Sequence, residues 1–115
     1  MNKELRVRKN EEFQKIIGKK SSVVNKSFVL YYMKNNLGHM RVGLSVSKKL
    51  GKAVVRNKIK RQVRHMVRTT FNSNLSYDFV IIVRNKFLDN SFEQNKLELE
   101  KLLKKVQKKG EKHEF

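Results

Sequence analysis

Apolar residues recur in short blocks along the chain, and the spacing within each block predicts a helix or a strand. In the first block, Phe13, Ile16 and Ile17 stand three and four positions apart, which is typical of one helix face. Asn10 precedes this block as a capping residue, and Gly18 follows it as a helix-ending residue. The block is therefore expected to be a short helix.

Three later blocks have the pattern of strands. Residues 23–33 alternate two sets of apolar side chains and predict a strand, with possible breaks at Asn25 and Lys26. Residues 40–46 alternate apolar and polar positions, so a strand with one polar face is expected there. Residues 79–83 are continuously apolar, as expected of a strand that is covered on both faces.

Two longer blocks have helical spacing. Residues 53–71 form the main predicted helix, and a last helix begins after a cap in which Ser91 pairs with Gln94 or Asn90 pairs with Glu93. The order helix, strands, helix, strand, helix predicts an α/β fold, a small two-layer α-β sandwich. The apolar stripes of the two helices are Val55, Ile59, Val63, Met66 and Val67, then Leu99, Leu102, Leu103 and Val106.

The length of 115 residues predicts a single domain, residues 1–115, with residues 1–9 and 108–115 flexible. The chain has no cysteine, which excludes disulfides, thiolate nucleophiles and cysteine zinc sites. No apolar run approaches the roughly 20 residues of a membrane span, and the basic start lacks the apolar stretch of a signal peptide. We therefore expect a soluble cytoplasmic protein with no membrane partner.

Acidic residues are absent from a long central stretch. Lys and Arg total 28 against 10 Asp and Glu, for a formal net charge of +18. From Phe13 to Tyr77 there is no acid, whereas 15 Lys or Arg lie there. Such segregation indicates a surface that faces a polyanion, since an ordinary solvated surface intersperses both signs. A membrane-surface peptide would instead need one wide apolar helix face and little else.

The positive charge is densest between Lys48 and Arg68, where nine Lys or Arg occur. Several of these cations are spaced four residues apart, and like charges at that spacing on a helix repel by a few tenths of a kcal/mol each. A row of such cations therefore indicates a partner that supplies the counter-charge. Arginine side chains suit phosphate oxygens because they bind in a bidentate manner. The alternative is a solvated helix face. The row comprises Arg56, Lys60, Arg64 and Arg68, with Asn57 and Arg61 on its flank.

Aromatic residues add a second feature of nucleic-acid binding. Single strands are bound by a positive groove together with stacking platforms. Phe13 on the first predicted helix and Tyr31 on the first predicted strand are the candidate platforms. The alternative for both is packing in the core.

The residues required for independent catalysis are poorly represented. Cleavage of a phosphodiester with two metals needs clustered carboxylates, but the acids lie near the two ends of the chain. A paired acid–base mechanism would need two histidines within reach of one phosphate. His39 falls in a predicted turn, His65 lies on the main predicted helix, residues 53–71, and His113 lies in the tail. No catalytic residue is therefore assigned, and the metal ligands, if any, stay unknown.

The central sequence resembles the signature region of bacterial ribonuclease P proteins. Residues 43–49 read Gly-Leu-Ser-Val-Ser-Lys-Lys, and residues 51–61 read Gly-Lys-Ala-Val-Val-Arg-Asn-Lys-Ile-Lys-Arg, followed by Arg64. The pattern Arg-Asn-basic-x-Lys-Arg-x-x-Arg is specific to that family. The resemblance extends to residues 10–13, residues 28–31 and the apolar strand near Val80, and so spans nearly the whole chain.

The resemblance implies a specific function. The family protein is the small subunit of a ribonucleoprotein that removes the 5′ leader of precursor tRNA, an endonuclease whose catalytic RNA carries the active site and its Mg²⁺ ions. The implied partners are ribonuclease P RNA and precursor tRNA, without an obligatory protein partner. The RNA-facing set implied by the motif is Arg56, Asn57, Lys60, Arg61 and Arg64, and charge patterning adds Lys48, Lys49, Lys52, Lys58 and Arg68.

The same resemblance places Phe13, Ile17 and Tyr31 in a cleft that receives the single-stranded leader. Ile17 stands where the family often has an aromatic residue, so an apolar wall is the expected role there. The resemblance also implies a left-handed β-α-β crossover, opposite to the hand that general packing rules predict. The alternative functions are a purely structural RNA-binding module, such as a ribosomal protein, or a DNA-compacting basic protein.

Overall fold

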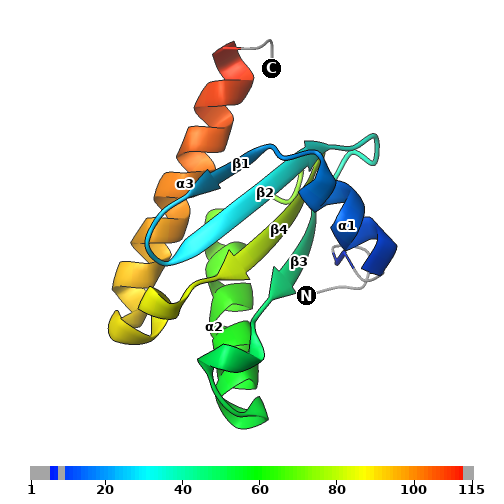
Figure 1. Cartoon of the computed structure of the whole chain (residues 1–115). Helices are drawn as coiled ribbons and strands as arrows, with labels where there is room; N and C mark the ends of the chain where they lie inside the picture. Colours follow the sequence, from blue (N-terminus) through cyan, green and yellow to red (C-terminus); the bar gives the residue numbers. More distant parts are fainter. Residues whose placement is uncertain (1–5, 8–9, 113–115) are drawn as a thin grey trace.

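The computed structural model describes residues 6–7 and 10–112, with side chains described through residue 109. Its helices and strands follow the predicted order, and Figure 1 shows their arrangement around one sheet. The elements are α1 (Asn10–Gly18), β1 (Ser22–Val24), β2 (Phe28–Lys34), β3 (Arg41–Ser45), the 3₁₀ turn η2 (Lys48–Leu50), α2 (Ala53–Thr70), β4 (Tyr77–Val83), the 3₁₀ turn η3 (Asn85–Asp89) and α3 (Phe92–Lys112).

The four strands form one mixed sheet in the order β1-β2-β4-β3. β4 pairs antiparallel with β2 and parallel with β3, so it occupies a central position. The mixed α/β architecture predicted from the sequence is confirmed. Because β3 and β4 are parallel neighbours joined through α2, they form a β-α-β unit. The hand of that crossover stays a prediction.

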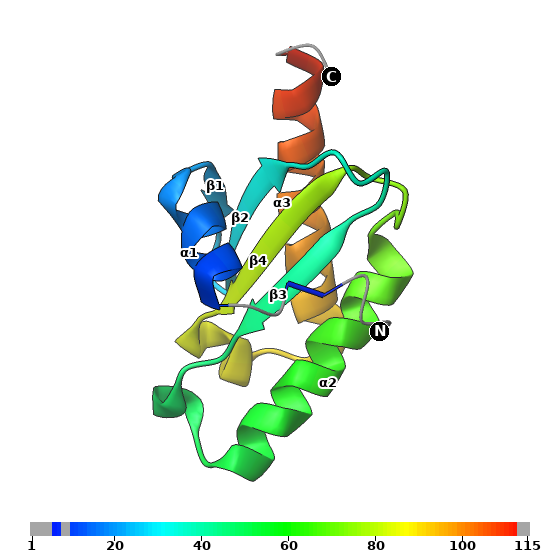
Figure 2. The ribbon, with the colours of Figure 1, turned by 90° about the vertical axis from the view of Figure 1, so that its right-hand side faces the viewer.

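The sheet is covered unequally on its two faces. α2 and α3 pack on one face, where Phe28, Phe79 and Ile81 are fully buried in the main core. α1 lies on the opposite face, where Ile16 and Val80 are fully buried in a smaller cluster. Figure 2 shows α1 on one side of the sheet and α2 on the other. The prediction that residues 79–83 are covered on both faces is confirmed.

Two predicted boundaries differ from the structure. The single strand expected over residues 23–33 is a hairpin of β1 and β2, because the chain reverses where only breaks were expected. Asn25 causes the reversal: its Oδ1 accepts hydrogen bonds from the backbone N–H of Ser27, at 3.1 Å, and of Phe28, at 3.0 Å. In the loop expected before α2, residues 48–50 form the 3₁₀ turn η2.

The two long helices bury the predicted stripes with one exception. Ile59, Val63, Met66 and Val67 of α2, and all four predicted residues of α3, are buried. Val55 is 40% exposed, however, because the first turn of α2 extends past the end of the sheet (Figure 1). In α3, Ser91 rather than Asn90 is the cap, since its Oγ accepts from the backbone N–H of Gln94 at 3.2 Å.

The structure places part of each terminal segment, and the flexibility expected of residues 1–9 and 108–115 stays a prediction. Arg6 forms a parallel bridge with Val42, and Val7 is buried, so this part of the first nine residues lies along the free edge of β3. Residues 1–5 and 8–9 lie outside the described structure. α3 continues to Lys112, within the segment expected to be flexible, and residues 113–115 are also outside the described structure.

A buried polar cluster ties the β1–β2 turn to the start of α3. Ser27 and Asn95 are almost fully buried, and the Ser27 hydroxyl donates to Asn95 Oδ1 at 3.0 Å. Asn95 Nδ2 donates to the Phe87 carbonyl, and Asn90 Nδ2 donates to Ser27 Oγ.

Within the described residues, no helix is long and apolar enough to cross a membrane.

Tyr77 should make the fold sensitive to strong alkali. Its side chain is buried and its ring stacks on Tyr32 with the ring centres 6.3 Å apart. Burial, with a smaller contribution from Tyr32, raises the pKa of Tyr77 from 10.0 to about 12. The folded state therefore holds this proton more tightly than the unfolded chain. The resulting stability is complete below pH 10 and is lost as pH rises through about 12.

Urea unfolding at several pH values checks this expectation in the wild type and in Tyr77→Phe. Between pH 10 and about 12 the variant should lose less stability than the wild type, because phenylalanine has no proton to release. An equal loss in the two proteins would contradict the assignment.

Candidate nucleic-acid interface

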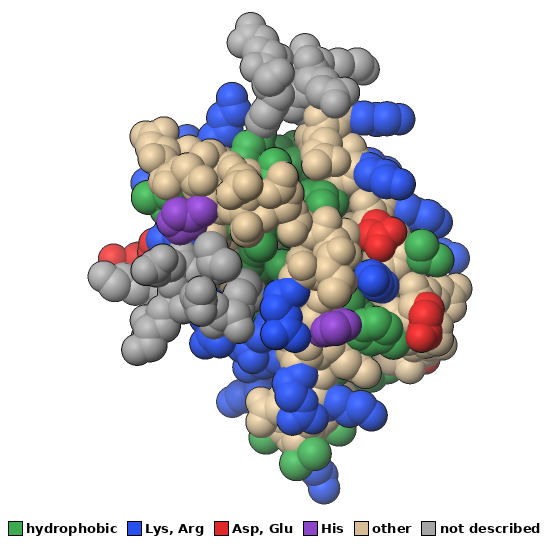
Figure 3. Space-filling view, turned by 180° about the vertical axis from the view of Figure 1, so that it is seen from behind, with side chains coloured by type: hydrophobic (Ala, Val, Ile, Leu, Met, Phe, Trp, Pro, Cys, Tyr) green, Lys and Arg blue, Asp and Glu red, His purple; other side chains and the backbone are tan. Residues whose placement is uncertain are grey.

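α2 presents an unneutralised cationic surface. Its apolar side is buried against the sheet, so its Lys and Arg side chains gather on the outer face of the molecule (Figure 3). Among the described residues, the ion pairs join Arg41, Lys86 and Lys101 to carboxylates, and none involves a cation between Lys48 and Arg68. Within the described part of the chain, this surface has no carboxylate counter-charge and is suited to an external anion.

The turn before α2 adds positive charge at the start of the helix. Ser47 Oγ accepts from the backbone N–H of Lys49, which closes η2. Gly51 has a φ of 142°, a conformation that residues with side chains rarely adopt, and its carbonyl accepts from Arg56 Nε at 3.2 Å. No acid lies in the first turn of α2, so the positive end of the helix dipole is reinforced rather than cancelled. The lysines placed there are Lys48, Lys49 and Lys52.

The three residues predicted to line the leader cleft come together on the α1 face of the sheet. Phe13 and Ile17 from α1, and Tyr31 from β2, all pack against the buried pair Ile16 and Val80. Each of the three keeps part of its surface exposed. The cluster is therefore an apolar surface that is open to solvent, in addition to being a small core.

A cavity of about 260 Å³ joins this apolar cluster to the basic helix. Phe13 lines it from the α1 side, and Lys60 and Arg64 line it from α2. The two sets of side chains meet at the edge of β3, although α1 and α2 lie on opposite faces of the sheet. The remaining lining residues are Arg6, Val7, Val42, Gly43 and Leu44.

The other predicted RNA-facing residues spread along the helix instead of sharing this cavity. Arg56 and Asn57 lie in the first turns of α2, and Arg68 lies in its last turn. Lys58 is two positions before Lys60 and therefore points about 160° away from it around the helix axis. The ten predicted residues form an extended contact surface, of which Lys60 and Arg64 border the apolar cluster.

Gly43 is a site residue that the sequence analysis did not identify. A Cβ atom at this position would lie 2.5 Å from Cζ of the Phe13 ring, so the ring packs directly on the backbone of β3. A glycine inside a strand signals such a close approach, and that signal was present in the sequence.

Arg41 and Asp78 were also missed. Arg41 Nε and Nη2 donate to the two carboxylate oxygens of Asp78 at 2.9 and 2.7 Å, and Nη1 donates to Glu12 Oε2 at 2.5 Å. Hydrogen bonding to Asp78, and then to Glu12, raises the pKa of Arg41 further above its ordinary range despite the opposing effect of burial. Asp78 directly precedes the apolar run of β4, and an acid at that position is the signal for a buried partner.

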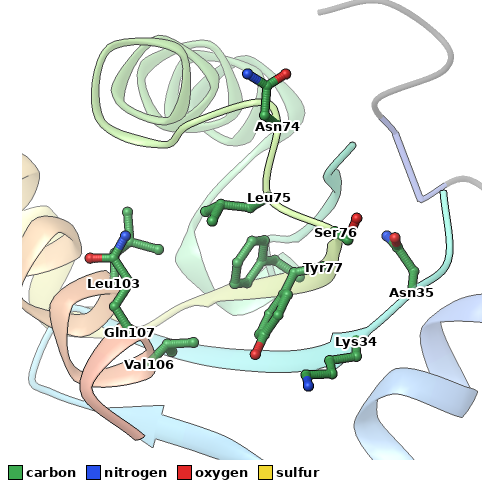
Figure 4. A pocket seen from close by; sticks show the side chains of 10 residues that line it. Lys34, Asn35, Asn74, Leu75, Ser76, Tyr77, Leu103, Val106 and Gln107 are labelled. Carbon is green, nitrogen blue, oxygen red and sulfur yellow. The ribbon is translucent and has the colours of Figure 1, made fainter. Parts of the chain in front are cut away.

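A second cavity, of about 630 Å³, lies on the α3 side of the sheet and contains none of the predicted site residues (Figure 4). Its walls are mainly apolar side chains from β4 and α3, with amide groups at its rim. The lining residues are Lys34, Asn35, Asn74, Leu75, Ser76, Tyr77, Phe79, Leu103, Val106 and Gln107.

The described residues contain no group of three or more His, Asp or Glu side chains that could hold a metal ion. His39 Nδ1 lies 3.0 Å from the carbonyl oxygen of Met40. The His65 ring lies beside Phe92, with the ring centres 5.7 Å apart. His113 lies outside the described residues.

Comparison with known proteins identifies the family. The family model described as Ribonuclease P matches residues 1–107. The chain belongs to the ribonuclease P protein family. It is 52% identical over 99 residues to a protein of Mesoplasma florum named ribonuclease P protein component, covering 84% of this chain and 90% of that protein.

Solved structures of ribonuclease P proteins share the fold. The protein from Staphylococcus aureus superposes with a TM-score of 0.80 at 42% identity, covering 89% of this chain and 94% of that one. The protein from Thermotoga maritima superposes with a TM-score of 0.76 at 33% identity, covering 87% of this chain and 96% of that one. The resemblance found in the sequence is thus confirmed at the level of family and fold.

Packing of Phe13 on Gly43 should make this position intolerant of a side chain. We expect Gly43→Ala to lower the free energy of unfolding by about 1–3 kcal/mol, the usual cost of overpacking, because the ring must move. Urea denaturation measures this cost. Gly18→Ala is the matched control, since a Cβ there meets no atom within 4 Å.

The cost of Gly43→Ala should fall when Phe13 is already alanine, because the clashing ring is then absent. Equal costs in both backgrounds would show that Phe13 does not occupy this position.

Proposed function

We propose that this chain is the protein component of ribonuclease P, which binds the catalytic RNA and precursor tRNA and assists endonucleolytic removal of the 5′ leader. Membership of the family supports this assignment. The observation that carries it is the cavity in which Phe13 meets Lys60 and Arg64. An unpaired strand needs both parts of this site, an apolar platform for its bases and cations for its phosphates.

In this proposal, the two surfaces serve two segments of nucleic acid. The outer face of α2 neutralises phosphates of the catalytic RNA with arginine and lysine side chains. Bases of the leader stack on Phe13 and Tyr31, and Ile17 provides an apolar wall beside them. Lys60 and Arg64 border both regions, so they reduce the repulsion between two polyanions that must approach each other.

We assign bond breakage and Mg²⁺ to the RNA partner. Mg²⁺ prefers carboxylate oxygens and water in octahedral geometry. The described residues offer no group of three or more acidic or histidine side chains for it, and Asp78 is bound by Arg41. The protein contributes binding and positioning. We place this activity in the cytoplasm.

A purely structural RNA-binding module is the alternative. It would explain the cationic face of α2, but it gives no reason for a half-exposed apolar cluster at the edge of that face. The two functions differ in one measurable respect, which is whether binding depends on an unpaired 5′ leader.

Removal of two cations from α2 should weaken cleavage mainly at low Mg²⁺. With fewer phosphates neutralised in Arg64→Gln/Arg68→Gln, RNA repulsion must be screened by added ions. Cleavage of precursor tRNA by the reconstituted ribonucleoprotein measures this effect across a Mg²⁺ series. The slope of log Kd against log salt should fall by about 0.7–0.9 for each phosphate that the variant no longer neutralises.

Lys86→Gln/Lys101→Gln is the control, because it removes the same charge from two exposed lysines that already pair with carboxylates. Unchanged cleavage at low Mg²⁺ in the α2 variant would contradict the positioning role. Cleavage by the purified protein without RNA would contradict the assignment of chemistry to the RNA.

Phe13→Ala should reduce the preference of the ribonucleoprotein for tRNA with a leader. We expect affinity for precursor tRNA to fall by about tenfold, since a base stacked on an aromatic ring contributes about 1–3 kcal/mol. Affinity for mature tRNA should stay unchanged. Fluorescence anisotropy with the two RNAs measures both.

Leu97→Ala serves as the control, because Leu97 is a 55% exposed apolar residue on α3, away from the cluster. If Phe13→Ala bound both RNAs as the wild type does, the leader-binding assignment would be wrong.

A further inference from the structure

The Arg41–Asp78 pair is a rigid anchor inside the sheet. Asp78 on β4 is 1% exposed and lies directly opposite Arg41 in the parallel register of β3 and β4. Both of its carboxylate oxygens accept from the Arg41 guanidinium, and Asn35 Nδ2 also donates to Oδ1 at 2.8 Å. A bidentate contact fixes the plane of the guanidinium as well as its position.

The remaining nitrogen of this guanidinium reaches out of the sheet to α1. Arg41 Nη1 donates to Glu12 Oε2 at 2.5 Å, so the first turn of α1 is bound to an anchor that is itself held by two strands. The Glu12 and Arg41 side chains are 30% and 22% exposed, which places this pair at the rim of the molecule and not in bulk solvent. Such partly buried pairs are screened less by salt than surface pairs.

The first turn of α1, which Arg41 holds through Glu12, also carries Phe13, the predicted stacking platform. Phe13 follows Glu12 in the sequence, and Gly43 follows Arg41 by two positions, which puts Arg41 and Gly43 on the same face of β3. The Phe13 ring packs on Gly43. The ion pair and the ring contact are therefore parallel links between the same two segments, one polar and directional, the other apolar.

We propose that Arg41 is a positioning residue for leader binding, which acts through Glu12 to hold Phe13 against Gly43 beside Lys60 and Arg64. This inference rests on the proposed function. Apolar packing of Ile16 keeps α1 on the sheet, but a hydrophobic contact has no preferred direction of its own. The guanidinium supplies that direction.

Glu12→Ala is the sharpest test, because it cuts the link to α1 and leaves the buried Arg41–Asp78 pair intact. Its matched control is Glu11→Ala, which removes the same charge from the same helical turn at an exposed position. Both variants are reconstituted with ribonuclease P RNA. The dissociation constants are then measured for that RNA, for precursor tRNA with a leader and for mature tRNA.

We expect Glu12→Ala to weaken binding of leader-bearing tRNA by about fivefold, a typical coupling between residues in contact. Binding of mature tRNA and of ribonuclease P RNA should change by less than about twofold, as should all three affinities in Glu11→Ala. A general loss of folding would instead lower every affinity together, and that result would overturn the proposal.

A second variant and a coupling measurement separate this inference from the proposed function. Arg41→Lys keeps a positive charge beside Asp78 but cannot make the three directed contacts, so it should show the same leader-specific loss. In a Phe13→Ala background, Glu12→Ala should have no further effect, since the side chain that it positions is gone.

Two outcomes would decide against the inference in different ways. If Phe13→Ala lost the leader preference while Glu12→Ala and Arg41→Lys kept it, the positioning role would be wrong and the proposed function would stand. If Phe13→Ala itself kept the leader preference, the proposed function would fail and the inference would fail with it.

Discussion

Burial of β4 on both faces determines how the rest of the molecule is arranged. Phe79 and Ile81 point into the core beneath α2 and α3, whereas Val80 points to the opposite face and is fully buried there beside Ile16. A strand of this kind requires helices on both sides of the sheet. α1 and α2 are consequently separated by the sheet, and side chains from both line the smaller cavity at the edge of β3.

Repulsion among the positive charges of the molecule opposes its compact folded state. A formal net charge of +18 on 115 residues produces repulsion that the folded state must overcome. The described structure uses its few carboxylates sparingly: Asp78 and Glu12 both bind Arg41, while the row of cations on α2 receives none. Stability and function are thus divided between surfaces. Arg41 is neutralised to fix α1, whereas the described cations between Lys48 and Arg68 have no carboxylate partner among the described residues and are available for a polyanion.

Local patterns predicted the parts of this structure that depend on local spacing. The stripe from Ile59 to Val67 and the continuous apolar run of β4 were both found from periodicity. The hairpin of β1 and β2 was missed because the sequence shows a break but not a reversal, which depends on Asn25 binding two backbone N–H groups. Val55 fits the stripe equally well, yet it is exposed because α2 is longer than the sheet that it covers.

The candidate site was only partly predictable, because it depends on contacts between elements that are distant in the sequence. Residue type and motif spacing identified Phe13, Lys60 and Arg64, but no local pattern shows that a helix on one face of a sheet will meet a helix on the other face. The Arg41–Glu12 contact joins residues 29 positions apart and depends on that same arrangement. Gly43 and Asp78 carried local signals, whose meaning became apparent only with their partners in place.

The strand order β1-β2-β4-β3 also determines when the sheet can assemble during synthesis. β2 and β3 are consecutive in the chain but not adjacent in space, since β4 lies between them. Neither strand gains this partner until residues 77–83 have left the ribosome. Until then, the entire acid-free stretch is exposed as a polycation with an incomplete core. A polyanion that met the chain at this stage would bind it nonspecifically, and such binding would compete with closure of the sheet.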